Sequence, residues 1–463
     1  MTIPTTAATA ARVSAPPVPG ERTTPSPAPV PAPGAPSSSG SASGVAGRVA
    51  TLIAMVRGSL EETPGRMRWL AAVGVAVALA FGLAGGQAFR SASGALERAG
   101  ANTDQLVRIQ AIQTNLVQAD ADATNAFLVG GLEPPAQRAD YLRAIGSATE
   151  LIAEGAQHQP ADGAALGALN QLLVTYTSEI ERARSNNRQA LPVGAQYLKD
   201  ASANLRTDAL PILKNLVDAN NARVATEFDN AGSAALWLVI AGLLALAVLV
   251  LELVWLARRT RRYLNVPLAA AAVVVLVALV AGVIALVAVG RTVDTVRTGV
   301  YAATLSTAKA RIAAFDAKSN ESLTLIARGS GAAFEKAWQT SDAAVRTELT
   351  HLAGNPESAG TRALPWPTYE GVHKQIRSLD NKGDWDGAVR LATGTGSDAG
   401  NGSFAQFDTA SARQLSSLNA ETASRLDRAR TWLPVGGALG VLAGLLAAAC
   451  TWRGFSLRLE EYR

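Results

Sequence analysis

The sequence has very few of the residue types on which most enzymes and metal sites depend. Its 463 residues include one cysteine, Cys450, and three histidines, His158, His351 and His373. One cysteine cannot form an intramolecular disulfide. The histidines lack the paired or Cys-flanked spacing of a metal site, and we interpret them as solvated surface residues. No nucleophile elbow, phosphate loop or HExxH motif occurs, so we expect no enzymatic activity and no cofactor.

The chain also lacks the concentrated positive charge of a nucleic-acid-binding protein. Its formal net charge is +5, but residues 90–233 carry 12 Lys or Arg against 16 Asp or Glu, and residues 290–431 carry 17 against 15. The excess of positive charge therefore lies mostly in short segments outside these two regions. This distribution fits the anionic surface of a membrane better than a nucleic-acid groove, and we expect no nucleic-acid partner.

The sequence contains several long apolar runs. Four of them, at residues 69–88, 234–256, 267–289 and 432–452, have the length of about 20 residues that a helix needs to cross a bilayer. Three carry no charge, and the second holds only Glu252. We expect Glu252 to reach the headgroups near the end of its span, with a proton or ion relay as the alternative. The chain is thus predicted to be a multi-pass membrane protein.

Basic residues beside the spans predict the orientation of the chain. The short connection at residues 257–266 holds Arg258, Arg259, Arg261 and Arg262, and cytoplasmic loops retain positive charge. We therefore place this loop in the cytoplasm, together with both termini of a plasma-membrane protein. The same four arginines are the predicted contact for a cytoplasmic partner, and residues 453–463 form a short cytoplasmic tail.

The first 68 residues differ in composition from the rest. Ala, Pro, Ser, Thr and Gly dominate up to about residue 47, and such a segment buries too little apolar surface to offset the entropy of ordering. We predict a disordered cytoplasmic tail over residues 1–68, with a short membrane-surface helix near residues 48–60.

The segments at residues 90–233 and 290–431 are predicted to be extracytoplasmic helical bundles. In the first, apolar residues recur at helical spacing, glycines and prolines near residues 130–135 end one helix and start the next, and Pro211 predicts a kink. Four antiparallel helices between two spans form a membrane-proximal bundle. The second segment follows the same plan about 195 residues later, so the predicted fold is all-α with an internal duplication.

Two polar groups in the first bundle are candidates for binding. Asp120 and Asp122 could hold a ligand amine, but we interpret them as solvated positions of a helix face. Asn186, Asn187 and Arg188 form a polar cluster at a helix end, where a turn also needs such residues. This cluster is the predicted docking site for an outer partner.

Small residues follow a four-residue repeat in the first and last spans. A repeat of this kind lines one helix face and lets another helix approach closely, either within the chain or in a second copy of it. The chain is rich in Ala and Gly, so chance spacing is the alternative. The predicted packing residues are Gly74, Ala78, Gly82, Gly86, Gly436, Gly440 and Gly444.

Several stretches resemble known sensors. A span that feeds a helical bundle and a helix that returns into the next span resemble bacterial chemoreceptors, but this chain has no HAMP-like coiled coil or signalling domain. The segments at residues 102–141, 184–202 and 379–394 are similar to GlnX-type actinobacterial membrane sensors. That resemblance covers nearly the whole chain beyond the tail.

The resemblance implies a relay of acidic amino-acid availability across the membrane. In such a relay a solute-binding lipoprotein docks outside and the soluble Ser/Thr protein kinase G responds inside. The alternatives are a transport component, a cell-envelope assembly component and direct binding of a small ligand by the bundles. Spans without paired polar or broken segments argue against transport.

Overall fold

All regular secondary structure is helical in the part of the chain that the computed structural model describes, namely residues 63–129, 133–260, 265–355 and 363–460. Four helical stretches are long and apolar enough to cross a membrane. The prediction of an all-α fold with four span-length helices is therefore confirmed. The helices are α2 (Thr63–Val129), α3 (Pro135–His158), α4 (Gly163–Arg188), α5 (Val193–Asn204), α6 (Leu210–Thr260), α7 (Val266–Val296), α8 (Ala302–Ile326), α9 (Ala332–Gly354), α10 (Trp366–Asn381), α11 (Trp385–Thr393), α12 (Gly400–Thr431) and α13 (Leu433–Glu460).

The first helix begins earlier than the sequence pattern predicts. Residues 1–62 of the predicted tail, and with them the expected short helix at 48–60, lie outside the described residues. Residues 63–68, also assigned to the tail, form the first turns of α2. Pro64 stands in the opening turn, where its missing N–H costs no hydrogen bond. The apolar run therefore continues a helix that has already started.

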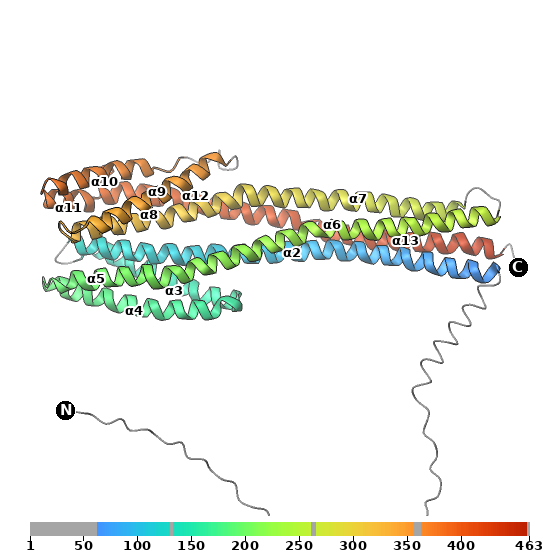
Figure 1. The fold of residues 1–463 in the computed structure, drawn as a ribbon, viewed down its shortest axis with the longest axis horizontal. Helices are drawn as coiled ribbons and strands as arrows, with labels where there is room; N and C mark the ends of the chain where they lie inside the picture. Colours follow the sequence, from blue (N-terminus) through green and yellow to red (C-terminus); the bar gives the residue numbers. More distant parts are fainter. Residues whose placement is uncertain (1–62, 130–132, 261–264, 356–362, 461–463) are drawn as a thin grey trace, which may run out of the picture. The chain divides into compact units, whose positions relative to one another are not determined.

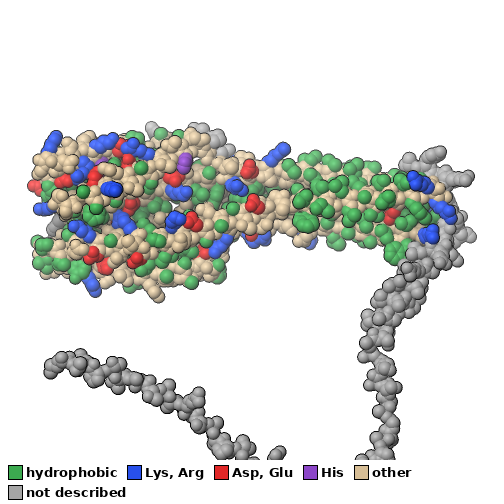
Figure 2. All heavy atoms as spheres, viewed as in Figure 1, with side chains coloured by type: hydrophobic (Ala, Val, Ile, Leu, Met, Phe, Trp, Pro, Cys, Tyr) green, Lys and Arg blue, Asp and Glu red, His purple; other side chains and the backbone are tan. Residues whose placement is uncertain are grey.

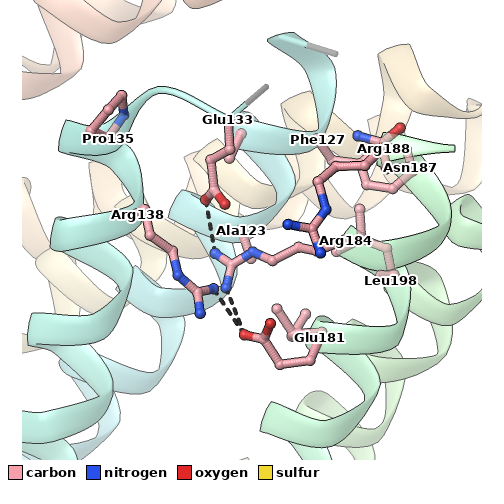
Figure 3. Close-up of a pocket in the computed structure, with 13 residues that line it drawn as sticks. Ala123, Phe127, Glu133, Pro135, Arg138, Glu181, Arg184, Asn187, Arg188 and Leu198 are labelled. Atoms are coloured by element: carbon pink, nitrogen blue, oxygen red, sulfur yellow. Dashed lines mark hydrogen bonds and ion pairs between the residues drawn. The ribbon is translucent and has the colours of Figure 1, made fainter. Parts of the chain in front are cut away.

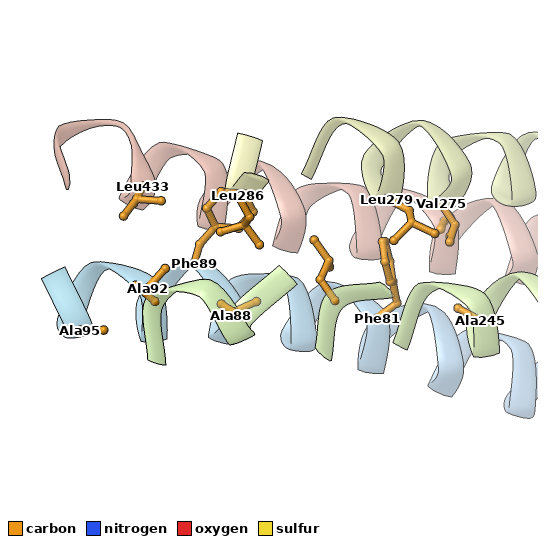
Figure 4. Close-up of a cluster of buried hydrophobic side chains, with 14 of the residues drawn as sticks. Phe81, Ala88, Phe89, Ala92, Ala95, Ala245, Val275, Leu279, Leu286 and Leu433 are labelled. Atoms are coloured by element: carbon orange, nitrogen blue, oxygen red, sulfur yellow. The ribbon is translucent and has the colours of Figure 1, made fainter. Parts of the chain in front are cut away.

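The four spans form a bundle in which each helix has two neighbours. Helix α2 packs against α6 and α13, and α7 packs against the same two helices from the other side (Figure 1). Figure 4 shows Phe81, Val275 and Leu279 in the space between these helices, and all three are buried. On the outside, large apolar side chains such as Leu243 and Ile284 remain exposed, and they give the span region the apolar surface visible in Figure 2. An apolar outer surface matches lipid as the surrounding solvent.

Small residues bring α2 and α13 into close contact. A Cβ atom built on Gly82 would lie 2.9 Å from the Cα of Gly444, and one built on Gly86 would lie 2.9 Å from a methyl group of Val441. Ala78 is fully buried. Gly436 packs against Phe89, and the Cα of Gly85 lies 3.6 Å from a Cβ built on Gly440. The seam between the first and last spans therefore lies within one chain, and glycine is what lets the two backbones meet.

Glu252 does not extend toward a helix end as the sequence pattern suggested. It is 2% exposed, and its carboxylate lies inside the span bundle against Gly74 of α2 and Thr451 of α13. A Cβ atom on Gly74 would collide with this carboxylate. The glycine leaves room for the side chain, which is why it can turn inward instead of snorkelling.

The polar half of α2 forms bundle 1 with α3, α4 and the continuous segment α5–α6. Pro135 opens α3, and a 3₁₀ turn at Pro160–Asp162 links α3 to α4. The irregularity expected at Pro211 is a π-helical turn, η2 (Leu205–Ala209), directly before the proline. Proline cannot donate the i to i−4 hydrogen bond, and wider π turns are a common local response. Chain continuity from bundle to span is preserved.

Bundle 2 consists of α8, α9, α10 and α12, with the short α11 at its far end. A second π turn, η3 (Arg297–Tyr301), joins α7 to α8, and α12 passes into α13 at Trp432. The core is aromatic: Trp366, Tyr369 and Phe407 are each no more than 1% exposed. The buried Tyr369 matches the buried Tyr176 of bundle 1 in kind, but the internal duplication remains a prediction.

The two bundles pack directly against each other. Helices α2 and α8 lie side by side along this contact, and Figure 1 shows the two bundles as neighbouring layers at the end of Thr63–Arg463 opposite the α6–α7 connection. In α8 every residue from Ala317 to Leu325 is buried. A bundle helix that faced solvent on one side would keep an exposed stripe. Helix α8 is therefore an internal helix of one combined assembly.

The glycine seam makes a testable prediction. Gly82→Val places new atoms where the α13 backbone lies, and overpacking of this kind costs about 1–3 kcal/mol. We expect a lower thermal unfolding midpoint in detergent, followed by tryptophan fluorescence. Gly290→Val in α7 is the matched control, because a Cβ at Gly290 has no neighbour within 4 Å. Equal shifts for both variants would contradict close packing at the seam.

Candidate functional site

A cavity of about 270 Å³ opens at the distal end of bundle 1, far from the spans. Figure 3 shows Glu133, Arg138, Glu181 and Arg184 converging at this cavity from α3, α4 and the α2–α3 connection. Arg184 pairs with Glu133 at 2.8 Å and with Glu181 at 3.1 Å, and Arg138 pairs with Glu181 at 2.8 Å. These guanidinium and carboxylate groups largely neutralise one another.

Tyr141 fixes the orientation of the two arginines. Its ring is 2% exposed, and the guanidinium carbon of Arg184 lies 4.1 Å from the ring centroid while that of Arg138 lies 5.5 Å away. Cation–π contacts of this kind hold a planar guanidinium flat on a ring. Burial raises the pKa of the Glu133 carboxyl, an effect that Arg138 opposes. The cavity floor is therefore a rigid, charge-balanced platform.

The predicted docking residues lie at the edge of this platform. Asn187 and Arg188 line the cavity, whereas the side-chain amide of Asn186 donates back to the carbonyl of Arg182 at 2.8 Å. Arg188 is exposed and makes no ion pair with any residue that the structure describes. The structure thus brings two of the three together at the cavity and places the third in the helix end.

An exposed apolar patch borders the same cavity. The turn after α4 places Ala190 at φ 55°, and the backbone N–H of Leu191 donates to the carbonyl of Asn186 at 2.9 Å. Leu191 is 44% exposed and Val193 is 46% exposed, with the exposed Pro192 between them. We call Leu191, Pro192 and Val193 the distal patch. Apolar side chains presented at a tip beside arginines are typical of protein-binding surfaces.

A second polar centre lies between the two bundles, around the carboxylate of Asp120. This residue is 1% exposed and lies on α2. Ser202 Oγ and Ser319 Oγ each donate to a different carboxylate oxygen of Asp120 at 2.6 Å. Tyr176 OH lies 3.4 Å from the same group, and Arg206 Nη1 pairs with it at 3.1 Å. We call Asp120 and these partners, together with Asp316, the junction network.

Arg206 connects the junction network to bundle 2. Its Nε donates to Asp316 Oδ1 at 2.9 Å and its Nη2 donates to Ser319 Oγ at 3.0 Å, both on α8. Asp316 in turn accepts from Ser341 of α9 at 2.6 Å and from Asn320 at 3.1 Å. The network therefore joins helices from both bundles through one guanidinium group.

The π turn η2 contains the residue that makes this bridge. Arg206 is the second residue of η2, and its Nη1 also donates to the carbonyl of Ser202 one turn earlier at 2.9 Å. Burial lowers the pKa of Arg206, but the two carboxylates of Asp120 and Asp316 outweigh burial and raise it. The guanidinium is thus held in its charged form.

Our interpretation of Asp120 and Asp122 as solvated residues is wrong. Asp120 belongs to the junction network, and Asp122 is half-buried, with Oδ2 lacking a hydrogen-bond partner among the described residues. Burial, with smaller contributions from the nearby carboxylates of Asp140 and Asp408, raises the pKa of Asp122 to about 8. Helix α2 has no solvated stripe at these positions because side chains of α4, α5 and α8 enclose Asp120, while α3 and α12 bring Asp140 and Asp408 near Asp122.

Sequence reasoning missed Arg206, Asp316 and Ser319 as functional candidates. The available signal was the polar run in α8, where Lys318, Ser319, Asn320, Glu321 and Ser322 follow one another in a helix that should have shown an apolar stripe. Five successive polar residues in the middle of a bundle helix indicate either full exposure or a buried polar network. All five are buried.

The predicted inner contact lies at the opposite end of the described assembly. Arg258 and Arg259 are exposed at the end of α6, while Arg261 and Arg262 lie outside the described residues. The amide of Asn265, at the start of α7, donates to the carbonyl of Gly454 in α13 at 2.8 Å. Basic side chains gather at this end (Figure 2). The start of α7 and the last helix, α13, are thus tied together.

The histidines divide into two groups. His158 and His351 are exposed as predicted, but His373 is 1% exposed and lies between Glu321 and Glu335. The expectation of a solvated residue is therefore wrong for His373. Within the described residues no group of three or more His, Cys, Asp or Glu side chains is placed to hold a metal ion.

One comparison with known proteins places part of the chain in a functional context. Residues 95–229, which contain bundle 1 with its distal cavity, match the family model of the actinobacterial sensor domain. No curated protein and no solved structure matches the chain. The match supports a sensing or signalling role for an actinobacterial membrane protein.

The junction network predicts a large cost for removing its cation. Arg206→Met leaves the buried carboxylate of Asp120 without its charge partner, and breaking a buried pair in this way costs about 3–5 kcal/mol. We expect the thermal unfolding midpoint to fall sharply. Lys214→Met is the control, since Lys214 forms an exposed i, i+4 pair with Asp218 in the same helix. A similar small effect for both variants would rule out a strong network.

Asp122 makes a pH-dependent prediction. Its folded-state pKa of about 8 lies above the ordinary value, so the free energy of unfolding falls as pH rises from about 4 to about 8. Asp122→Asn removes this loss, and we expect the variant to unfold at higher temperature than the wild type at pH 8 and at a similar temperature near pH 4. The exposed Asp218→Asn should show no such pH dependence. A constant difference across this range would argue against a buried acid.

Proposed function

We propose that the chain is a transmembrane signal transducer that relays extracytoplasmic acidic amino-acid availability to a cytosolic Ser/Thr protein kinase. A solute-binding lipoprotein docks on the bundles outside, and the kinase, of the protein kinase G type, contacts the inner end of the spans. The observation that carries this proposal is the junction network, which fuses the two bundles into one body. A fused body whose helices run on into the spans can convert docking at one end into a shift at the other.

The distal end of bundle 1 is the proposed docking surface. The distal patch offers apolar area, and Arg188 offers an exposed cation beside it. Arginine is among the residue types that are enriched at the energetic centres of protein interfaces, and burial of apolar area favours association. Apart from Arg188, the charged groups that line the cavity are already paired, which favours a protein surface over a free ligand as the occupant. Asn186, Asn187 and Arg188 remain the proposed contact residues on the chain.

Transmission requires two arrangements of the bundles that the partner binds with different affinity. A shift of a two-state equilibrium from mostly one state to mostly the other takes a difference of several kcal/mol. Helix α2 passes without interruption from the span into the bundle, and the segments α5–α6 and α7–α8 do so through π turns. Rigid helices of this kind carry a rotation or an axial shift over their whole length.

The inner end of the spans is the proposed output. Arg258, Arg259, Arg261 and Arg262 and the tail after α13 would present the altered arrangement to the kinase. The link from Asn265 to Gly454 supports joint movement of the loop and the tail, because it ties their two helices together. Both termini are cytoplasmic in this proposal, and a second copy of the chain remains open as an additional partner.

The alternatives differ in what they predict for the cell. A transport component should lower uptake when its gene is deleted, whereas a transducer should leave uptake intact and change the phosphorylation of kinase substrates after amino-acid addition. A direct sensor should bind aspartate or glutamate as the purified full chain. An envelope-assembly component should neither bind these amino acids nor change their uptake or the phosphorylation of kinase substrates.

Photocrosslinking tests the docking proposal. A photoreactive residue at Gln189 should capture a solute-binding lipoprotein, identified by mass spectrometry, with a yield that changes on addition of glutamate or aspartate. The double variant Leu191→Asp/Val193→Asp should reduce that capture at least about tenfold, because charges replace apolar contacts worth a few kcal/mol. Val174→Asp is the matched control, since Val174 is 64% exposed on α4 away from the tip. Unchanged capture by the double variant would refute docking at the distal patch.

A further inference from the structure

Bundle 2 contains a row of buried charged side chains that the proposed relay does not use. Its centre is His373 of α10, a residue 1% exposed whose ring stacks on Trp338 of α9 at 3.6 Å between ring centroids. His373 Nδ1 lies 2.8 Å from a carboxylate oxygen of Glu321 on α8, which is itself 1% exposed. His373 Nε2 lies 3.4 Å from a carboxylate oxygen of Glu335 on α9. One imidazole thus faces carboxylates from two other helices.

The row continues on both sides with alternating charge. Lys318 Nζ pairs with Glu321 at 2.7 Å, and it also donates to the carbonyl of Ala392 in α11 at 3.3 Å. Arg377 Nε pairs with Glu335 at 3.1 Å, and Arg377 also pairs with Asp380. Without His373 the row holds two cations and three carboxylates. It is balanced only when the imidazole carries both protons.

Two further cations and two further carboxylates near the row pair with one another, and Arg328, Asp384 and Asp386, which line a groove together with Glu335 and Arg377, are exposed. Arg346 of α9 pairs with Asp342 on its own helix and with Glu370 of α10, and Lys374 also pairs with Glu370. From α12, the apolar side chain of Phe404 packs against Tyr369. Lys336 and Lys382 are exposed. None of these groups supplies a charge that would replace the imidazolium.

Electrostatics favour the doubly protonated imidazole at neutral pH. Burial lowers the pKa of His373, but its hydrogen bond to Glu321 and the nearby carboxylate of Glu335 outweigh burial and raise it. Burial likewise raises the pKa of Glu321, yet Lys318 and His373 hold it at about 2. For a histidine whose folded-state pKa is raised, the stabilisation is present at low pH and is lost as pH rises through that pKa.

His373 and Glu335 lie between α9 and α10, so the titration of the imidazole affects how these two helices are held together. A groove of about 610 Å³ runs between these helices, and Glu335, Trp338, His373 and Arg377 line it. We propose that His373 is a pH-dependent lock that joins α10 to α8 and α9, closed while the imidazole carries both protons and released when it loses one. Release leaves an unbalanced carboxylate in the row and loosens α9 against α10 across the groove.

The chain is well suited to a direct test, because it has only three histidines. His158→Gln/His351→Gln changes two exposed side chains and leaves His373 as the single histidine. The full-length protein in nanodiscs is labelled with ¹³C,¹⁵N-histidine, and the ring resonances are followed from pH 5.5 to pH 9.5. We expect a titration midpoint above the ordinary value of about 6.5. Glu335→Gln should lower the midpoint, whereas Glu348→Gln, beside the exposed His351, should not.

Amide hydrogen exchange tests the mechanical part on the same samples. After correction for the intrinsic pH dependence, exchange in α9 and α10 should rise at least about tenfold as pH passes the His373 midpoint, and by more than exchange in α4 of bundle 1 does. His373→Gln should exchange in α9 and α10 at the faster level at every pH. A midpoint at or below 6.5, or exchange in α9 and α10 that follows the intrinsic rate throughout, would overturn the proposal.

Discussion

The arrangement depends on one constraint: a guanidinium group that lies between two helical bundles and is only partly exposed must be paired with carboxylates. Arg206 meets this condition only if Asp120 of α2 and Asp316 of α8 come together, and these residues lie 196 positions apart. Leaving the buried carboxylate of Asp120 without its cation would cost several kcal/mol, a large part of the stability of a domain. This pairing fixes the register of α2 against α8, in addition to the stabilisation that the buried area between the two helices provides. The hydroxyls of Ser202 and Ser319 donate to the two carboxylate oxygens of Asp120, and these hydrogen bonds further restrict how the helices can be placed.

This constraint explains why the assembly could transmit a signal rather than only bind a partner. The junction network holds bundle 1 and bundle 2 as one body, and the glycine seam between α2 and α13 closes the spans into one bundle below it. The π turn η2 lies within the junction network, because it contains Arg206, and the π turn η3 joins the span helix α7 to α8. Helical geometry changes within five residues at each turn. π turns inside helices are frequently found at functional sites. A displacement at the distal patch would pass through the junction network and these turns before it reaches the spans.

The sequence predicted the fold well because its strongest signals are local. Apolar runs located the four spans, and the prolines at 135 and 211 located a helix start and a backbone irregularity. The polar interior was not predictable in the same way, because its pairs are long-range. The sequence pattern placed Asp120 and Asp122 on a solvated helix face, but helices distant in sequence, such as α5 and α8, bond to Asp120. It also predicted a solvated His373, which Glu321 and Glu335 enclose in the structure. The inward position of Glu252 was not predictable either, because the space that its carboxylate fills is left by Gly74 of another helix. The local sequence pattern predicts the individual helices, whereas the burial of polar residues depends on which helices pack against one another.

The central claim, that the two bundles form one cooperative body, can be tested by weakening one and observing the other. Leu169 is fully buried in the core of bundle 1, and Leu169→Ala should cost about 2–5 kcal/mol by leaving a cavity. Hydrogen exchange of α8, α9 and α12 in bundle 2 is then measured in the full-length protein in nanodiscs. If the junction network fuses the bundles, protection in these helices of bundle 2 falls in parallel with protection in α4. Loss of protection confined to bundle 1, with bundle 2 unchanged, would contradict the claim.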